Sequence, residues 1–462
     1  MTDLDPEEFR RLGRAVVDWV ADYRAGLPDR PVRGAVVPGE VRAALGPLVP
    51  ESPQPLEALL AELDRVVVPG STHWQHPGFM AYFPANASLL SVLGDVLSGG
   101  LGAQGMLWST SPAATEVEQV LLDELAGALG LDAAYTTAGG GGGSIQDSAS
   151  SAVLVALLAA LHRSSPAWRT TGVEGVERVY VTAETHSSVA KAVRVAGLGE
   201  RALVVVPGTP HAMSPAALAE AMATDVALGL RPVLVCPTVG TTGTGAVDPV
   251  RAITEAAREH GAWVHVDAAW AGVAALCPEH RDLLDGVELA DSFCTDAHKW
   301  LLTAFDASLL WVRDARALPE ALSITPEYLR DGASGVVDYR DWQVPLGRRF
   351  RALKLWAVVH GHGLDGLREH LRGHVALAAE LEERIAAHPD LELAAPRSLS
   401  LVCLRHTGGD DATRALLERV NASGEALLSH TVVDGRYVVR VAVGGVATRR
   451  EHLDRLWTIM RG

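Results

Sequence analysis

The sequence contains very little lysine. Lysine occurs only at Lys191, Lys299 and Lys354, and arginine supplies the rest of the 40 basic residues. Lys299 lies in the stretch DSFCTDAHKWLL (291–302), beside Trp300 and before an apolar run. An arginine there would make at least as good a salt bridge, but it could not lose its proton and act as an amine nucleophile. The sequence therefore indicates Lys299 as a candidate nucleophile.

Cysteine is also scarce, which argues against a disulfide framework or a structural zinc site. The four cysteines lie far apart and form no CxxC pair, so we expect free thiols in a cytoplasmic protein. The pair His360 and His362 lacks an evident third ligand, and we predict no metal.

The chain has neither an excess of basic residues nor a long apolar run. Its formal net charge of −16 argues against nucleic-acid or anionic-membrane partners. The longest apolar stretch, 152–161, is too short to span a membrane, and the start of the chain has no export-signal pattern. With 48% hydrophobic and 21% charged residues, the composition is typical of a soluble globular protein.

The order of apolar segments predicts an α/β fold. A chain of 462 residues suggests two or three domains. A first helix is expected after Asp5, which can cap it, and Pro6. Beyond it, expected strands alternate with helices at 215–229 and 249–260, which is typical of a mostly parallel sheet covered on both faces. The expected strands are 176–182, 202–206, 231–237, 263–269 and 307–312.

After residue 356 the pattern changes to that of a smaller α+β lobe. A long helix is expected there, followed by strands at 391–404 and 432–443. The closing helix is expected to begin at a capping box formed by Thr448 and Glu451.

Three further segments hold candidate ligand-binding groups. A glycine run (139–143) leads to an expected helix start at Ser148, Ala149 and Ser150, which could bind a phosphate. The run fits neither the Walker nor the GxGxxG pattern, and a flexible connector is the alternative. Asp267 ends a buried strand, with a helix cap as its alternative role. His186 precedes a helix, where it could also be a structural cap.

Together these groups match what pyridoxal phosphate requires of a protein. Its aldehyde condenses with a lysine, its ring nitrogen needs an acidic partner, its ring needs a stacking surface, and its phosphate needs an anion site.

The motifs of the chain resemble one family almost from end to end. They include THWQHPGFMAYFP (72–84), GGGSIQDSAS (141–150), HVDAAWAG (265–272), ADSFCTDAHKWLL (290–302) and DYRDWQVPLGRRFRALKLW (338–356). In this order they resemble the group II pyridoxal-phosphate-dependent decarboxylases, most closely the aromatic-L-amino-acid decarboxylases. The resemblance implies decarboxylation of an aromatic L-amino acid to an arylalkylamine and carbon dioxide.

The resemblance also implies a role for each site residue. Lys299 would carry pyridoxal 5′-phosphate as a covalent aldimine, Asp267 would pair with the ring nitrogen, and His186 would stack on the ring. Tyr328 would protonate the substrate carbanion. Further cofactor contacts would come from Ser148, Ala149, Ser150, Thr242, Ala269, Asp296 and His298, and substrate contacts from Trp74, Tyr82, Phe83, Pro84 and Gly347.

By the same resemblance the fold is the aspartate-aminotransferase type of pyridoxal-phosphate enzyme. We expect an N-terminal helical arm (1–88), a large cofactor-binding domain (89–356) and a small C-terminal domain (357–462). We also expect a homodimer with the site at the interface.

Three positions depart from the family pattern. Asp147 replaces a common glycine, Asp296 a frequent asparagine, and Met106 the phenylalanine of animal relatives.

Two other reactions stay open at this point. One is an aldehyde synthase, which decarboxylates and then oxidatively deaminates; the presence of Tyr328 and His186 favours simple decarboxylation. The other is an aminotransferase. The preferred amino acid also stays open among tryptophan, 5-hydroxytryptophan, tyrosine, DOPA and phenylalanine.

Overall fold

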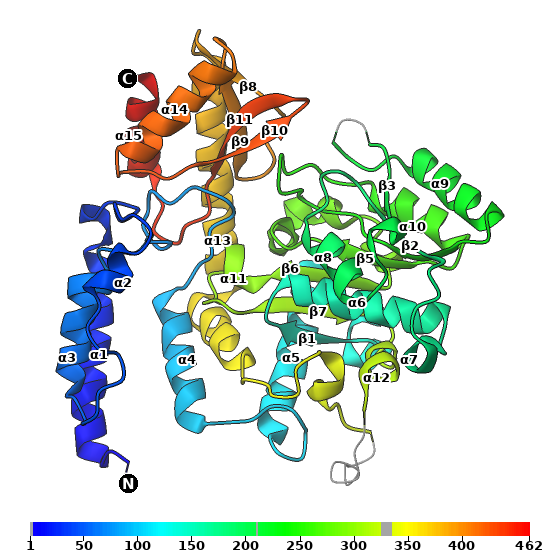
Figure 1. Cartoon of the computed structure of the whole chain (residues 1–462), viewed down its shortest axis with the longest axis horizontal. Coiled ribbons are helices and arrows are strands. Elements are labelled where there is room, and N and C mark those ends of the chain that lie inside the picture. Colours follow the sequence, from blue (N-terminus) through cyan, green and yellow to red (C-terminus); the bar gives the residue numbers. More distant parts are fainter. Residues whose placement is uncertain (1–2, 209–210, 325–334) are drawn as a thin grey trace.

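A large twisted sheet forms the centre of the molecule (Figure 1). The computed structural model describes residues 3–208, 211–324 and 335–462. Within these residues the sheet has seven strands in the order β1-β7-β6-β5-β4-β2-β3, and only β7 runs antiparallel to its neighbours. The strands are β1 (Gly142–Gln146), β2 (Glu177–Val181), β3 (Leu203–Val205), β4 (Arg231–Val235), β5 (Trp263–Asp267), β6 (Ser292–Asp296) and β7 (Ser308–Val312).

The predicted α/β class and the five predicted strands are confirmed, but two strands were missed. The last two glycines of the run, Gly142 and Gly143, begin β1, whose residues are buried. A Cβ atom added at Gly143 would lie 2.9 Å from the Leu122 side chain and 3.0 Å from that of Trp311. The interpretation as a flexible connector is therefore wrong for these two residues, which allow close packing within the sheet, whereas Gly139 and Gly140 are exposed before the strand. The strand β6 was missed because its sequence, SFCTD, mixes polar and apolar residues although every one of them is buried.

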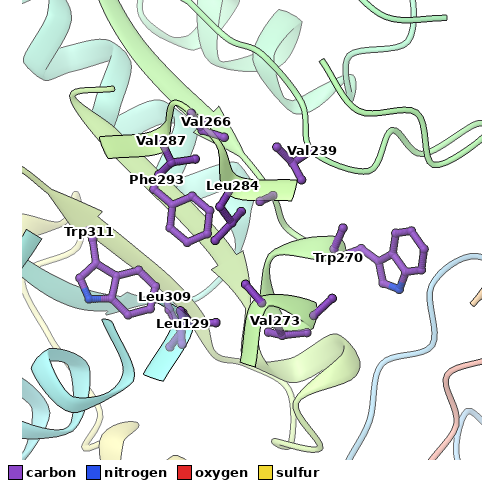
Figure 2. Packing of buried hydrophobic residues seen from close by; sticks show 14 of the residues in the cluster. Leu129, Val239, Val266, Trp270, Val273, Leu284, Val287, Phe293, Leu309 and Trp311 are labelled. Atoms are coloured by element: carbon purple, nitrogen blue, oxygen red, sulfur yellow. The ribbon is translucent and has the colours of Figure 1, made fainter. Parts of the chain in front are cut away.

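Helices cover both faces of the sheet and create two apolar cores. One core includes residues of α5 (Pro112–Leu129), α9 (Pro215–Ala227) and α10 (Val250–Arg258). The other includes residues of α6 (Ala149–Ser164), α8 (Ser188–Val195) and α12 (Ala317–Leu322). Figure 2 shows Phe293 and Trp311 within the first core, and Trp270 projecting away from them.

The C-terminal lobe is built on an antiparallel sheet. Among the described residues this sheet has four strands in the order β10-β11-β9-β8. One helix lies between β9 and β10 in the chain, and another follows β11. Its elements are β8 (Leu391–Leu393), β9 (Leu401–His406), α14 (Asp410–Ala422), β10 (Ser429–Val433), β11 (Arg436–Ala442) and α15 (Arg450–Arg461). The long helix α13 (Ala352–Ala386), kinked at Gly363, leads into it.

The predicted capping box of the closing helix is wrong. Arg449 is the N-cap of α15, and its N–H donates to Nδ1 of His452 at 3.0 Å. Thr448 instead donates its hydroxyl to the carbonyl of Pro77 at 2.8 Å. The threonine therefore ties the C-terminal lobe to the N-terminal segment, which the local sequence pattern does not reveal.

The N-terminal arm lies apart from the sheet (Figure 1). The predicted cap of α1 (Pro6–Ala25) is confirmed, because Asp5 accepts from the N–H groups of Glu7 and Glu8. Helices α2 (Glu40–Ala44) and α3 (Leu56–Glu62) follow, with α3 contacting α1. Next, α4 (Leu89–Leu101) packs on α13. The domain boundaries at 88 and 356 stay predictions. Among the described residues, no helix combines the length and the apolar character that crossing a membrane requires.

Candidate functional site

Two buried carboxylates end neighbouring strands at one edge of the large sheet. Asp267 ends β5 and Asp296 ends β6. The two strands run parallel, with Asp267 opposite Cys294. Lys299 follows within the short helix α11 (Ala297–Trp300). Ligands of parallel α/β sheets bind at the carboxyl ends of the strands, so these groups lie where such a ligand is expected.

Lys299 is ion-paired to Asp296. The lysine Nζ lies 2.8 Å from Oδ2 of Asp296, and Nε2 of His298 lies 3.5 Å from the same oxygen. Burial disfavours the charged amine, but attraction to Asp296 and Asp267 leaves the pKa of Lys299 above its ordinary value. Burial likewise opposes ionisation of Asp296, but Lys299 and His298 hold its pKa below the ordinary value. Burial lowers the pKa of His298, which favours a neutral ring.

Asp267 lies in a dry setting next to this ion pair. It is 4% exposed, and Oδ1 accepts from the Ala269 N–H at 3.0 Å. Burial raises the pKa of Asp267, while Lys299 and His186 pull the pKa in the opposite direction. A cationic ring nitrogen placed here would favour the carboxylate, because the lost hydration would be replaced by an opposite charge.

His186 is exposed on the segment that follows β2. Its Nδ1 accepts from the Ser188 N–H at 3.2 Å and lies 2.9 Å from the Ser188 hydroxyl. Because Nδ1 accepts, the hydrogen of the neutral ring is on Nε2. The imidazole therefore has a fixed local partner and an accessible surface on which a planar group could stack.

The start of α6 offers the expected anion site. Ser148 is the N-cap and accepts from the Ser151 N–H, while Ala149 is buried and Ser150 exposed. The first N–H groups of a helix have no partner inside it, and they favour an anion. The Ser148 hydroxyl donates to Oδ1 of Asp147 at 2.8 Å. This bond engages Asp147 locally, although its charge stays at the same helix end.

Asn86 is a positioning residue that sequence reasoning missed. Its Nδ2 donates to the Lys299 carbonyl at 2.5 Å and to the Gly444 carbonyl at 2.7 Å. Its Oδ1 accepts from the Val446 N–H at 2.8 Å. One side chain thus joins the arm, the lysine-bearing turn and the C-terminal lobe. A single asparagine in an irregular segment gives no signal of such a role in one sequence.

Aromatic rings lie beside the lysine-bearing turn. Phe83 stacks on Trp270 with 4.2 Å between ring centroids, and Trp270 stacks on Trp300 at 5.4 Å. Figure 2 shows the Trp270 indole reaching out from the segment after β5. Pro84 is buried, whereas Trp74 and Tyr82 are exposed and stack on each other at 5.9 Å.

Among the described residues, Thr242 and Gly347 make no hydrogen bond or ion pair with Lys299, Asp296, Asp267 or His186. Thr242 is exposed in the turn after β4. Gly347 is exposed, and a Cβ atom added there would lie 3.3 Å from Nε2 of Gln104. Tyr328 lies outside the described residues. Within the part of the chain that the structure describes, no three metal-binding side chains come together.

The arrangement fits pyridoxal phosphate. Lys299 offers the amine, Asp267 a buried carboxylate for the ring nitrogen, His186 an accessible ring, and the start of α6 an anion site. Four groups of different chemistry thus lie on segments that follow β1, β2, β5 and β6 of one sheet.

Known proteins resemble this chain over nearly its full length. The family described as "Pyridoxal-dependent decarboxylase conserved domain" matches residues 38–407. Phenylacetaldehyde synthase of Arabidopsis thaliana is 44% identical, covering 99% of this chain and 96% of the relative. Tryptophan decarboxylase 2 of Oryza sativa subsp. japonica is 42% identical, covering 99% and 95%. The crystal structure of Oryza sativa TDC with PLP and tryptamine matches with a TM-score of 0.96 at 40% identity, covering 100% of this chain and 98% of that one.

Proposed function

The chain belongs to the pyridoxal-dependent decarboxylase family, and we propose that it converts an aromatic L-amino acid into the corresponding arylalkylamine and carbon dioxide. It is a pyridoxal-phosphate-dependent carboxy-lyase. The observation that carries the proposal is the ion pair between Lys299 and the buried Asp296, next to the buried Asp267, at the carboxyl edge of the sheet.

Each residue of the set has a proposed task. Pyridoxal phosphate, when bound, supplies a ring that accepts the electrons released as the Cα–carboxylate bond breaks. Lys299 holds the cofactor through Nζ and releases it to the substrate amine. Asp267 keeps a proton on the ring nitrogen, and His186 stacks on the ring. The tyrosine at position 328 is proposed from sequence alone to return a proton to Cα.

The start of α6 is proposed to hold the phosphate. Ser148, Ala149 and Ser150 offer backbone N–H groups and hydroxyls, and His298 offers a ring N–H just after the end of β6. Ala269, whose N–H already orients Asp267, and Thr242, on the turn after β4, are proposed as further contacts.

An aromatic side chain is the proposed specificity element of the substrate. Phe83 stacks on Trp270, which stacks on Trp300 next to Lys299, and Trp74 and Tyr82 add exposed ring surface near the buried Pro84. The Oryza sativa structure with tryptamine supports an indole-bearing substrate. Gly347, which has no side chain to occupy space, is proposed to leave room for an indole.

An aldehyde synthase is the second candidate, because the Arabidopsis thaliana relative that is 44% identical is a phenylacetaldehyde synthase. An aminotransferase is a weaker alternative, because the family model that matches the chain describes decarboxylases. The two candidates differ in their products, since the synthase releases aldehyde, ammonia and peroxide in place of amine.

A panel of amino acids tests the proposal directly. The purified enzyme is given tryptophan, 5-hydroxytryptophan, tyrosine, DOPA, phenylalanine and, as controls, glutamate and aspartate. Carbon dioxide, amine, aldehyde and peroxide are measured for each. We expect amine and carbon dioxide in equal amounts from aromatic substrates, with tryptophan preferred. Aldehyde and peroxide as main products would establish the synthase instead, and a preference for glutamate would overturn the substrate class.

A homodimer is proposed from uncovered apolar surface. Helix α1 has no buried residue, and two of its apolar side chains, Phe9 and Val17, are 61% and 48% exposed. Together with α3 and Val96 of α4, α1 lines a groove of about 880 Å³. An apolar groove with exposed hydrophobic side chains on its walls is a common feature of protein–protein contact sites. A second copy of the chain is therefore the proposed occupant, with the site near the interface.

A cytoplasmic location is also proposed. All four cysteines are buried and unpaired in the structure, which fits a compartment that keeps thiols reduced.

A further inference from the structure

We infer that Asp296 slows cofactor capture, because in the cofactor-free chain its carboxylate holds the Lys299 amine as an ammonium ion that cannot attack an aldehyde. The inference rests on the proposed role of Lys299.

The geometry makes Asp296 the nearest anion to the lysine. Nζ and Oδ2 are 2.8 Å apart, and Asp296 is 2% exposed. The Lys299 side chain is 25% exposed, so the pair is partly shielded from water and interacts more strongly than one at the surface. The second neighbour of the carboxylate, His298, is farther away at 3.5 Å, and burial lowers its pKa, which disfavours its charged form. Lys299 is therefore the cation that compensates Asp296.

The other groups around the pair would not keep Lys299 charged if Asp296 were replaced. Asp267 on β5 also attracts Lys299, but its own ionisation is opposed by burial. The thiols of Cys236 on β4 and Cys294 on β6 are uncharged, because burial raises their pKa well above the ordinary value. His186 faces Asp267 from the segment after β2. With an amide at position 296, burial is the largest remaining influence and favours the neutral amine.

Capture of the cofactor depends on that neutral amine. The lone pair of Nζ must form the new bond to the aldehyde carbon, and the aldehyde oxygen must leave as water. An ammonium ion has no lone pair, so its proton must first pass to Asp296 or to solvent. The rate at which Lys299 binds the cofactor covalently is then proportional to the fraction of Lys299 that is present as the free amine.

The experiment compares capture rates in the cofactor-free, full-length chain and its Asp296→Asn variant. Each is mixed with pyridoxal phosphate between pH 6 and 9, about the range in which most enzymes stay folded. The growth of visible absorbance is followed, and borohydride with peptide mapping locates the adduct. We expect the variant to capture faster near neutral pH by on the order of tenfold, because a lower lysine pKa leaves a larger fraction of free amine. We also expect its rate to level off at a lower pH.

Asp95→Asn is the matched control, because the Asp95 carboxylate lies 3.5 Å from a different lysine, Lys354. It should leave the capture rate unchanged. A readout without cofactor comes from trace labelling with acetic anhydride, with the exposed Lys191 as internal reference. Lys299 should become more reactive in Asp296→Asn and stay as in the parent in Asp95→Asn.

Pyridoxine 5′-phosphate, which has no aldehyde, separates this inference from simple repulsion of the phosphate. We expect its affinity to be similar in parent and variant. The inference is overturned if capture by Asp296→Asn is unchanged or slower, or if tighter binding of pyridoxine 5′-phosphate accounts for the whole gain. An adduct on Lys191 or Lys354 would overturn the proposed role of Lys299 itself.

Discussion

At the scale of single residues, Asp267 carries the electronic part of the proposed chemistry. We predict that Asp267→Asn retains the cofactor but lowers turnover by orders of magnitude, because an amide cannot hold a proton on the ring nitrogen as a carboxylate does. The measurement combines steady-state decarboxylation with the visible absorbance of the bound cofactor. Asp291→Asn is the control, since Asp291 pairs with Arg163 near the start of β6. Near-normal turnover of Asp267→Asn would show that Asp267 serves only to accept the local hydrogen bond from the Ala269 N–H.

The sequence reveals some of these residues and conceals others. Lys299 stands out because the chain has so few lysines, and Asp267 because it ends an apolar strand. The direction in which Asp296 faces could not be predicted, since it depends on the pairing of β6 with its neighbours. Asn86 could not be found either, because its partners lie more than 200 residues away along the chain.

At the scale of elements, a buried ion pair joins α5 to the segment before α13. Glu118 and Arg348 are 3% and 1% exposed in their side chains and pair directly. Glu118 also accepts from the Ile145 N–H at 2.7 Å, and Arg348 donates to the Ile145 carbonyl at 3.1 Å. Both therefore support β1, whose end leads into the proposed phosphate site.

We predict that Glu118→Ala lowers the free energy of unfolding by about 3–5 kcal/mol, because it leaves the Arg348 guanidinium buried without a counter-charge. Urea denaturation of the purified protein at a fixed concentration measures the change. The control is Glu116→Ala, because Glu116 is exposed on the same helix and accepts only from Trp108 among the hydrogen bonds of the described residues. This control should cost about 0.5 kcal/mol or less. Equal effects in the two variants would show that the buried pair adds nothing.

Element prediction succeeded where one local pattern determined the outcome. The parallel strands are apolar runs, and α1 has a cap and helical spacing. It failed for β1, where glycine disfavours a strand locally but Leu122 and Trp311 leave no room for anything larger. It also failed for the cap of α15, because Thr448 is engaged by Pro77, far away in the sequence.

At the scale of the whole molecule, the arm and α4 present apolar surface that a second copy would cover. Leu93, Val96, Leu97 and Leu101 of α4 are 48–67% exposed. We predict that Leu97→Asp shifts the protein from dimer to monomer, because the interface would have to bury a charge. Sedimentation velocity over a range of concentrations measures this shift. Leu228→Asp is the control, since Leu228 is 72% exposed at the end of α9, away from the arm (Figure 1). A Leu97→Asp protein that stays dimeric would exclude α4 from the interface.

The central claim concerns which lysine carries the cofactor, and one measurement tests it most directly. The purified holoenzyme is reduced with borohydride, digested and mapped by mass spectrometry. The chain has three lysines, so the result is unambiguous. We predict that the pyridoxyl adduct lies on Lys299 alone and that Lys299→Ala abolishes both the adduct and turnover. An adduct on Lys191 or Lys354, or a Lys299→Ala enzyme that still releases carbon dioxide, would contradict the account.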